Sequence, residues 1–171
     1  MAGGGTTTAW VADTGLFVAC GRRDDEKHVA LSRFARRRGI EFVIPRSVHE
    51  ELGGAPERST PESVPVDAAI DEGWVRVADP DYTDPLVLTV MDDARRFIAN
   101  ASNRDEDRIE KADTALAGVA AGLLADGPAD AVRLVTTDRD AGEATVAVLD
   151  SHGFDEQVEW RDGFELLDDL G

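Results

Sequence analysis

Short apolar runs alternate along the chain with longer stretches in which apolar residues recur at helical spacing. The runs are rich in Val, Ile, Phe and Trp, as β-strands are. They lie at residues 9–12, 41–44, 74–77, 132–136 and 158–160. Single strands that alternate with helices are typical of a mostly parallel sheet with helices on both faces. The pattern therefore predicts an α/β fold, built on a parallel twisted sheet of about five strands sandwiched by helices.

The stretches between the runs predict helices. One covers residues 26–38, where Asp24 or Asp25 can cap the start and Gly39 ends the helix. The other predicted helices lie at 45–52, 68–71, 86–101, 106–125 and 141–151. Each of them precedes or follows a predicted strand, which supports the layered arrangement.

The remaining segments are irregular or terminal. Residues 53–65 are rich in Gly, Pro, Ser and Glu, and their prolines break any regular element, so they predict a loop. Residues 1–8 are predicted to be a flexible tail. No internal repeat is visible, and we expect a single domain over residues 1–171.

The composition is that of a globular protein with one hydrophobic core. The chain has 171 residues, of which 42% are hydrophobic and 31% charged, and a disordered chain would have less apolar content. No apolar run reaches the roughly 18 residues of a membrane span, and the N-terminus lacks the basic start of a signal peptide. The lone Cys20 excludes an internal disulfide and, with only three histidines, leaves no Cys/His zinc site. We therefore expect a cytoplasmic protein without a membrane segment.

The net charge of −17 is extreme, and a diffuse negative field repels nucleic acid. Only Lys27 and Lys111 are lysines, and such an acid-rich, lysine-poor composition resembles that of proteins from salt-loving organisms, where salt screens the field to a few Å. Between Thr14 and His49, eight basic residues outnumber four acidic ones. This segment is either an RNA-binding patch or a helix with a solvated, arginine-rich face. The candidate RNA-binding residues of the chain are Arg22, Arg23, Arg46 and Arg139.

Four carboxylates fall where the predicted fold would bring them together. Asp13 and Asp138 follow predicted strands, and open parallel sheets bind ligands outside the carboxyl ends of their strands. Glu51 lies on the short helix after the second strand. Asp113 opens a helix that is too apolar to face solvent broadly, so its carboxylate needs a partner. Glu110, one helical turn earlier on the same face, could assist it.

Gathering carboxylates has a free-energy cost that a cation would remove. Two of them about 4 Å apart repel by roughly 4 kcal/mol at an effective dielectric of about 20. Either their pKa values rise or a cation lies among them, and ligation by oxygen alone suits Mg²⁺ or Mn²⁺. Taken singly, each acid also has a structural explanation: Asp13 could cap a helix, and Asp138 with Asp140 could form an Asx-type turn. Glu50 and Glu51 could be an exposed helical pair.

Four short motifs occur in an order that resembles the PIN-domain ribonucleases. They are V-A-D-T-G-L-F at 11–17, I-P-R-S-V-H-E-E-L at 44–52, A-D-T-A-L-A at 112–117 and V-T-T-D-R-D at 135–140. The resemblance covers the chain from Trp10 to about Trp160. It implies a parallel sheet between helices and an acidic quartet that binds Mg²⁺ or Mn²⁺. Residues 83–103 match nothing assigned in the family; they could shape an RNA groove or an oligomer interface.

The resemblance also implies roles for individual residues. By match, the catalytic and metal-binding acids are Asp13, Glu51, Asp113 and Asp138, with Asp140 a fifth metal-binding acid. Asp13 and Asp138 would be the most direct ligands, while the other two would bind through water or orient the nucleophile. Thr14 and Thr137 match positions where the family often has a hydroxyl near the metal. Arg139 could contact phosphate or pair with a neighbouring acid.

The activity implied is that of a Mg²⁺- or Mn²⁺-dependent endoribonuclease, with RNA as the substrate. Some small members of the family are toxins restrained by a small antitoxin protein, and others mature ribosomal RNA; nothing in the residues separates the two. Homodimers are common in the family. The main alternative is a PIN-like module that binds RNA or a protein without cutting.

Three other classes that use gathered acids fit the sequence less well. A phosphoaspartyl hydrolase of the haloacid-dehalogenase type needs a second acid where Gly15 stands. A response-regulator receiver needs a lysine near its last strands, and that lysine is missing here. DNA flap cleavage by a related fold would normally involve a longer chain with additions that bind DNA.

Overall fold

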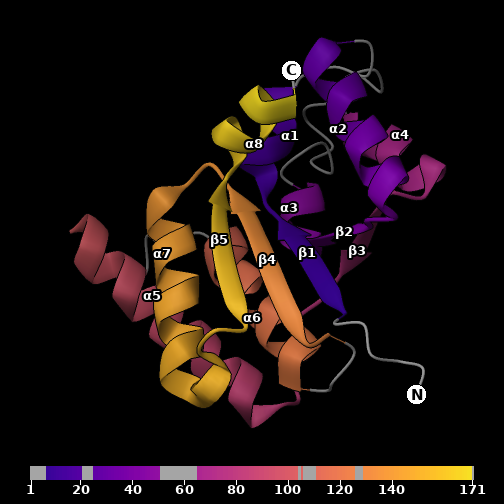
Figure 1. Cartoon of the computed structure of the whole chain (residues 1–171). Coiled ribbons are helices and arrows are strands. Elements are labelled where there is room, and N and C mark those ends of the chain that lie inside the picture. Colours follow the sequence, from indigo (N-terminus) through magenta and orange to yellow (C-terminus); the bar gives the residue numbers. More distant parts are fainter. Residues whose placement is uncertain are drawn as a thin grey trace, which may run out of the picture.

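Five parallel strands form the centre of the protein in the computed structural model, which describes residues 7–20, 25–50, 65–103, 105, 111–125 and 129–170 (Figure 1). The strands are β1 (Thr8–Ala12), β2 (Phe42–Pro45), β3 (Val75–Ala78), β4 (Ala131–Thr136) and β5 (Val158–Asp162). They lie in the order β3-β2-β1-β4-β5, and every neighbouring pair is parallel. The predicted α/β fold with a parallel five-stranded sheet is confirmed.

Helices connect the strands as the alternating pattern predicts. The described helices are α1 (Thr14–Cys20), α2 (Glu26–Arg38), α3 (Arg46–His49), α4 (Pro65–Glu72), α5 (Pro85–Ser102), α6 (Lys111–Ala125), α7 (Arg139–Leu149), the π-helical turn η5 (Asp150–Phe154) and α8 (Gly163–Leu170). α2 has the predicted bounds, because Gly39 at φ 63° ends it in the left-handed conformation. α1 and α8 are not among the helices that the sequence predicts. No described helix is long and apolar enough to cross a membrane.

Most predicted boundaries differ from the observed ones by one to three residues, and two of these differences concern the predicted tail and loop. Thr8 pairs with Ala131 in the sheet, so it belongs to β1 and not to the predicted tail. Pro65 begins α4 instead of ending the predicted loop, since proline fits the first turn of a helix, where no N–H is needed. The rest of that loop, residues 53–64, and residues 1–6 of the tail lie outside the described residues.

Helices cover both faces of the sheet, and the two larger hydrophobic clusters among the described residues lie between the sheet and these helices. The side chains of β1 alternate between them, with Trp10 and Ala12 in one cluster and Val11 in the other. The first cluster lies against α1, α2, α4 and α8, and the second against α5, α6 and α7 (Figure 1). Since both faces of the central strands are buried, the backbone at their ends is held in place from two sides.

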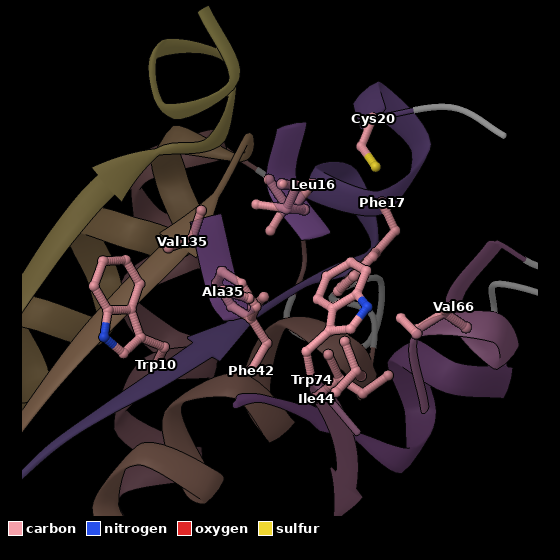
Figure 2. Packing of buried hydrophobic residues seen from close by; sticks show 14 of the residues in the cluster. Trp10, Leu16, Phe17, Cys20, Ala35, Phe42, Ile44, Val66, Trp74 and Val135 are labelled. Carbon is pink, nitrogen blue, oxygen red and sulfur yellow. The ribbon is translucent and has the colours of Figure 1, made fainter. Parts of the chain in front are cut away.

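Aromatic rings tie the first cluster together (Figure 2). Trp10 meets Phe42 edge to face with 5.8 Å between ring centroids, and Phe42 meets Trp74 in the same way at 6.3 Å. Such pairs contribute about 0.5–1.5 kcal/mol each beyond the area that they bury. The rings come from β1, β2 and the residue before β3, so they fasten these three strands to one another.

The order of the strands reverses between β1 and β4. From β1 the chain continues to β2 and β3 on one side, and it then returns to form β4 on the other side of β1. In open parallel sheets such a reversal marks the place where ligands bind, beyond the carboxyl ends of the strands. The register sets Ala12 opposite Val135, and the Asp13 N–H donates to the Val135 carbonyl at 3.3 Å. Asp13 therefore lies beside the end of β4, where Asp138 follows.

Candidate metal centre

Two of the predicted ligands, Asp13 and Asp138, are connected through the hydroxyl of Thr136. Thr136 Oγ1 donates a hydrogen bond to Asp13 Oδ2 and accepts one from the Asp138 backbone N–H at 3.0 Å. Thr136 is fully buried. The sequence prediction misses this residue and names its neighbour Thr137. The signal that could have found it is a hydroxyl at the last position of an apolar strand, two residues before the acid.

Burial makes the Asp13 carboxylate costly to ionise. It raises the pKa of Asp13 from 3.8 to about 6, and the nearby charge of Asp138 adds to the rise. Hydrogen bonds from Thr136 and from the backbone N–H groups of Leu16 and Gly15 lower the same pKa but do not offset the burial. The Gly15 N–H donates to Asp13 Oδ1 at 3.1 Å, at the start of α1. The Asp13 carboxylate thus accepts a hydrogen bond at the start of α1, as a helix cap does. Its raised pKa shows a cost of ionisation that capping alone does not explain.

Asp138 begins α7 and keeps one carboxylate oxygen available. Its Oδ1 accepts from the Ala141 N–H at 3.2 Å, and its carbonyl oxygen accepts from the Gly142 N–H at 3.0 Å. Its Oδ2 accepts no hydrogen bond from any residue that the structure describes. Asp140 lies in the first turn of α7, where a negative charge interacts favourably with the helix dipole. The turn predicted around these two acids is therefore the N-terminal cap of α7.

Two glycines let α1 and α8 close around Thr137, one of the predicted hydroxyls. A Cβ atom at Gly15 would lie 1.8 Å from Thr137 Oγ1, and one at Gly163 would lie 2.9 Å from Thr137 Cγ2. Any larger residue at position 15 would force Thr137 or α1 to move. A second acid at that position, as a haloacid-dehalogenase site needs, is thus incompatible with this packing.

A third close contact fastens α7 to β5. A Cβ atom at Gly142 would lie 2.6 Å from ring atoms of Trp160, so the indole packs directly against the helix backbone. The Trp160 Nε1–H donates to the carbonyl oxygen of Thr136 at 3.3 Å. The residue that holds Asp13 and the helix that carries Asp138 are therefore braced by the same side chain.

The rest of the predicted site lies partly outside the described residues. Glu51 and Glu110 are outside them altogether, and of Asp113 and Thr14 only the backbone is described. Asp113 belongs to the first turn of α6, which packs against β1 and β2. Among the described side chains, no group of three or more His, Cys, Asp or Glu could hold a metal ion. The described part of the site supplies two carboxylates at the point where the strand order reverses.

The predicted RNA-binding arginines are paired with acids where they are described. Arg139 Nε donates to Glu143 at 2.9 Å, while 78% of the Arg139 side chain remains exposed. Arg46 Nε donates to the two oxygens of Asp79, at 3.0 and 3.2 Å. The candidates at positions 22 and 23 lie outside the described residues. The sequence predicts that Arg139 either contacts phosphate or pairs with a neighbouring acid, and in the structure it pairs with an acid.

A cavity of about 450 Å³ lies beside the ends of β2 and β3. Its lining includes Arg46, Ser47, Glu50, Tyr82, Arg95 and Thr114. Glu50 and Thr114 are the chain neighbours of the predicted ligands at positions 51 and 113. The cavity is therefore adjacent to the chain segments that carry the other half of the predicted quartet.

The chain was compared with known protein families, curated proteins and solved structures. The family described as Halobacterial PIN domain matches the chain over residues 6–171. Comparisons with curated proteins and with solved structures find no match.

Proposed function

The chain belongs to the halobacterial PIN-domain family, and from this premise we propose that it is a Mg²⁺- or Mn²⁺-dependent endoribonuclease that hydrolyses RNA phosphodiester bonds. PIN domains are generally nucleases, so the family accounts for a nuclease-type fold. The metal, the RNA substrate and the catalytic residues are our proposal and do not follow from the family alone.

The observation that carries the proposal is the pair of carboxylates, Asp13 and Asp138, joined through Thr136. Burial and the charge of Asp138 both oppose ionisation of Asp13, as its raised pKa of about 6 indicates. A divalent cation between them would oppose both effects, since an opposite charge favours the ionised form. The donors are hard oxygen atoms, and Asp138 Oδ2 is available, so the donor set fits Mg²⁺ or Mn²⁺.

We assign Asp13 and Asp138 as direct ligands. Glu51 and Asp113 would complete the quartet through water or by orienting the nucleophile, and Asp140 would be a fifth acid. When bound, the metal supplies a water of lowered pKa and neutralises charge on the phosphoryl oxygens. Within the chain, Thr136 holds the Asp13 carboxylate, and the first turn of α7 holds that of Asp138 through the backbone N–H at position 141. Ligands fixed in this way need little rearrangement during the reaction.

The second candidate is a PIN-like module that binds a protein or RNA without cutting it, and the net charge of −17 favours its protein-binding form. A negative field weakens association with nucleic acid unless salt screens it. For the nuclease we propose RNA as the substrate. We propose two further partners because they are common in the family: a small antitoxin protein, if the protein is a toxin, and a second copy of the chain.

The test is cleavage of a structured RNA pool at molar salt, with and without Mg²⁺ or Mn²⁺. Three proteins are compared: wild type, Asp13→Asn, and Asp71→Asn as a control that removes one exposed acid on α4. We expect metal-dependent cleavage by the wild type and by Asp71→Asn, and none by Asp13→Asn.

Two results would contradict the proposal in different ways. Equal cleavage by all three proteins would show that the cleavage does not depend on Asp13 or that it comes from a contaminant. If no protein cuts while calorimetry shows metal bound to the wild type and to Asp71→Asn but not to Asp13→Asn, the carboxylates form a metal site in a protein that does not cut RNA, which supports the second candidate.

A further inference from the structure

We propose that the cavity beside β2 and β3, here called the α5 pocket, is a subsite that binds one nucleotide of an RNA strand next to the scissile bond. It is lined by Arg46, Ser47, Tyr82, Met91, Arg95 and Thr114, among others, and α5 closes one side of it. The choice of RNA as ligand rests on the proposed ribonuclease function. The contacts, charges and volume of the pocket indicate that it binds a ligand.

The α5 pocket lies beside the chain segments that carry two of the predicted metal ligands. The pocket is built from α3, the segment after β3, α5 and the first turn of α6. α3 leads directly to Glu51, and Thr114 follows Asp113, so two of the four walls are the segments that carry predicted ligands. α5 lies within residues 83–103, to which the motifs of PIN-domain ribonucleases assign no role, although the Halobacterial PIN domain model includes them. That stretch therefore adds a wall next to the candidate metal centre.

The α5 pocket is lined by two arginines and by two acids, Asp79 and Glu50. Arg95 is half-buried on α5 and forms no ion pair with any described residue, in a protein whose acids outnumber its basic residues by 17. Arg46 uses Nε for its pair with Asp79, which leaves its two terminal nitrogens without a described acceptor. Guanidinium groups bind phosphate through paired hydrogen bonds. Both arginines line the same cavity, so they can meet a phosphate group there.

The lining of the α5 pocket also includes an exposed aromatic ring and apolar and hydroxyl side chains that a base could contact. Tyr82 is 59% exposed, and bases stack on exposed aromatic rings whatever their identity. Met91 is held in place because it packs on Gly118 of α6, where a Cβ atom would lie 2.7 Å from the Met91 sulfur. Ser47 Oγ is buried and has no hydrogen-bond partner among the described residues. A buried hydroxyl in that state gains from a ligand that supplies a partner.

The volume agrees with this occupant. Pockets that bind small molecules measure about 300–1,000 Å³, so 450 Å³ suits a nucleotide. A pocket that holds a base and its phosphate would position the strand and add to substrate affinity without touching the reacting atoms.

The test uses the fact that Tyr82 is the only tyrosine in the chain. The full-length protein is labelled with 3-fluorotyrosine, which gives one fluorine resonance, and is titrated with the four nucleoside 5′-monophosphates in molar salt with a chelator. Arg95→Gln is compared with Arg96→Gln, a matched variant on the same helix whose arginine is 65% exposed and pairs loosely with Asp93 at 3.5 Å. The same proteins are then assayed for metal-dependent RNA cleavage.

We expect at least one monophosphate to shift the resonance, with affinity about tenfold lower in Arg95→Gln and unchanged in Arg96→Gln. In the cleavage assay, Arg95→Gln should raise KM about tenfold and leave kcat unchanged. No shift with any nucleotide, or equal affinities in the two variants, would overturn the pocket.

The two proposals fail separately. If nucleotides bind as expected but RNA is not cut, the pocket stands and the nuclease proposal falls. If the wild type cuts RNA but Arg95→Gln cuts with the same KM and no nucleotide binds, the nuclease proposal stands and the pocket falls.

Discussion

Replacing Asp13 by asparagine should stabilise the metal-free protein at neutral pH. The folded state holds a proton at Asp13 more tightly than the unfolded state, because burial raises the pKa from 3.8 to about 6. Ionisation of Asp13 therefore lowers the stability of the folded state. This destabilisation is absent below a pH of about 4, grows as the pH rises towards 6 and is complete above it. Asparagine has nearly the same shape without the charge, so the substitution removes this destabilisation.

The magnitude follows from the two pKa values. The difference between 3.8 and about 6 corresponds to about 3 kcal/mol at pH 7, at roughly 1.36 kcal/mol per pKa unit. The side-chain oxygen of the asparagine can still accept from the Gly15 N–H. Its amide NH₂ group, however, would replace the oxygen that now accepts from the Thr136 hydroxyl, and we expect the loss of this hydrogen bond to lower the free energy of unfolding by about 1 kcal/mol. The net gain in the free energy of unfolding should be about 2 kcal/mol at pH 7 and less than about 1 kcal/mol at pH 5.

Urea unfolding in molar salt with a chelator measures this difference, and Asp71→Asn controls for the loss of one negative charge. High salt does not remove the effect, because salt screens a buried charge much less than an exposed one. If Asp13→Asn were no more stable than the wild type at pH 7, or if its advantage were as large at pH 5, the reasoning about Asp13 would be refuted.

Three further predictions concern the same site. Mg²⁺ or Mn²⁺ should raise the melting temperature of the wild type at pH 7 but not that of Asp13→Asn, and less so at pH 5, where a proton competes for the ligand; an equal rise in both proteins would exclude Asp13 as a ligand. Thr136→Val should shift the acid limb of the pH–activity profile upwards, because a hydrogen bond that lowers the pKa of Asp13 is lost; a profile that overlays the wild type would contradict this. Gly15→Ala should lower the free energy of unfolding by about 1–3 kcal/mol, because its Cβ atom would lie 1.8 Å from Thr137 Oγ1; an unchanged urea midpoint would show that α1 moves freely.

Most of the fold could be predicted from the sequence because its elements have clear limits. α2 is bounded by Asp25 and Gly39, and the strands are short apolar runs between polar segments. α1 was harder to predict, because its seven residues are almost all apolar and follow β1 after a single Asp, so no helical periodicity shows. α8 has a signal that could have been used: Asp162 accepts hydrogen bonds from the N–H groups of Phe164 and Glu165, in the spacing of a capping motif.

The site was predictable to the extent that strand ends define it. Asp13 and Asp138 could be singled out because each follows an apolar strand, and parallel strands end at one edge of the sheet. Thr136 could have been noticed as a hydroxyl at the end of an apolar strand, but its contact with Asp13 depends on the register that sets Ala12 opposite Val135. A shift of one residue would turn the other face towards Asp13. The places of Glu51 and Asp113 in the quartet stay predictions.

The contact between Gly142 and Trp160 has a consequence for how the sequence can change over time. Neither residue is among the predicted ligands, yet the indole supports both the Thr136 carbonyl and the helix that Asp138 begins. A larger residue at position 142 would fit only if the side chain at position 160 became smaller, because the two already touch. These positions should therefore vary together among descendants of a common ancestor, and any lineage that keeps the carboxylate pair should keep one compatible combination at the two sites.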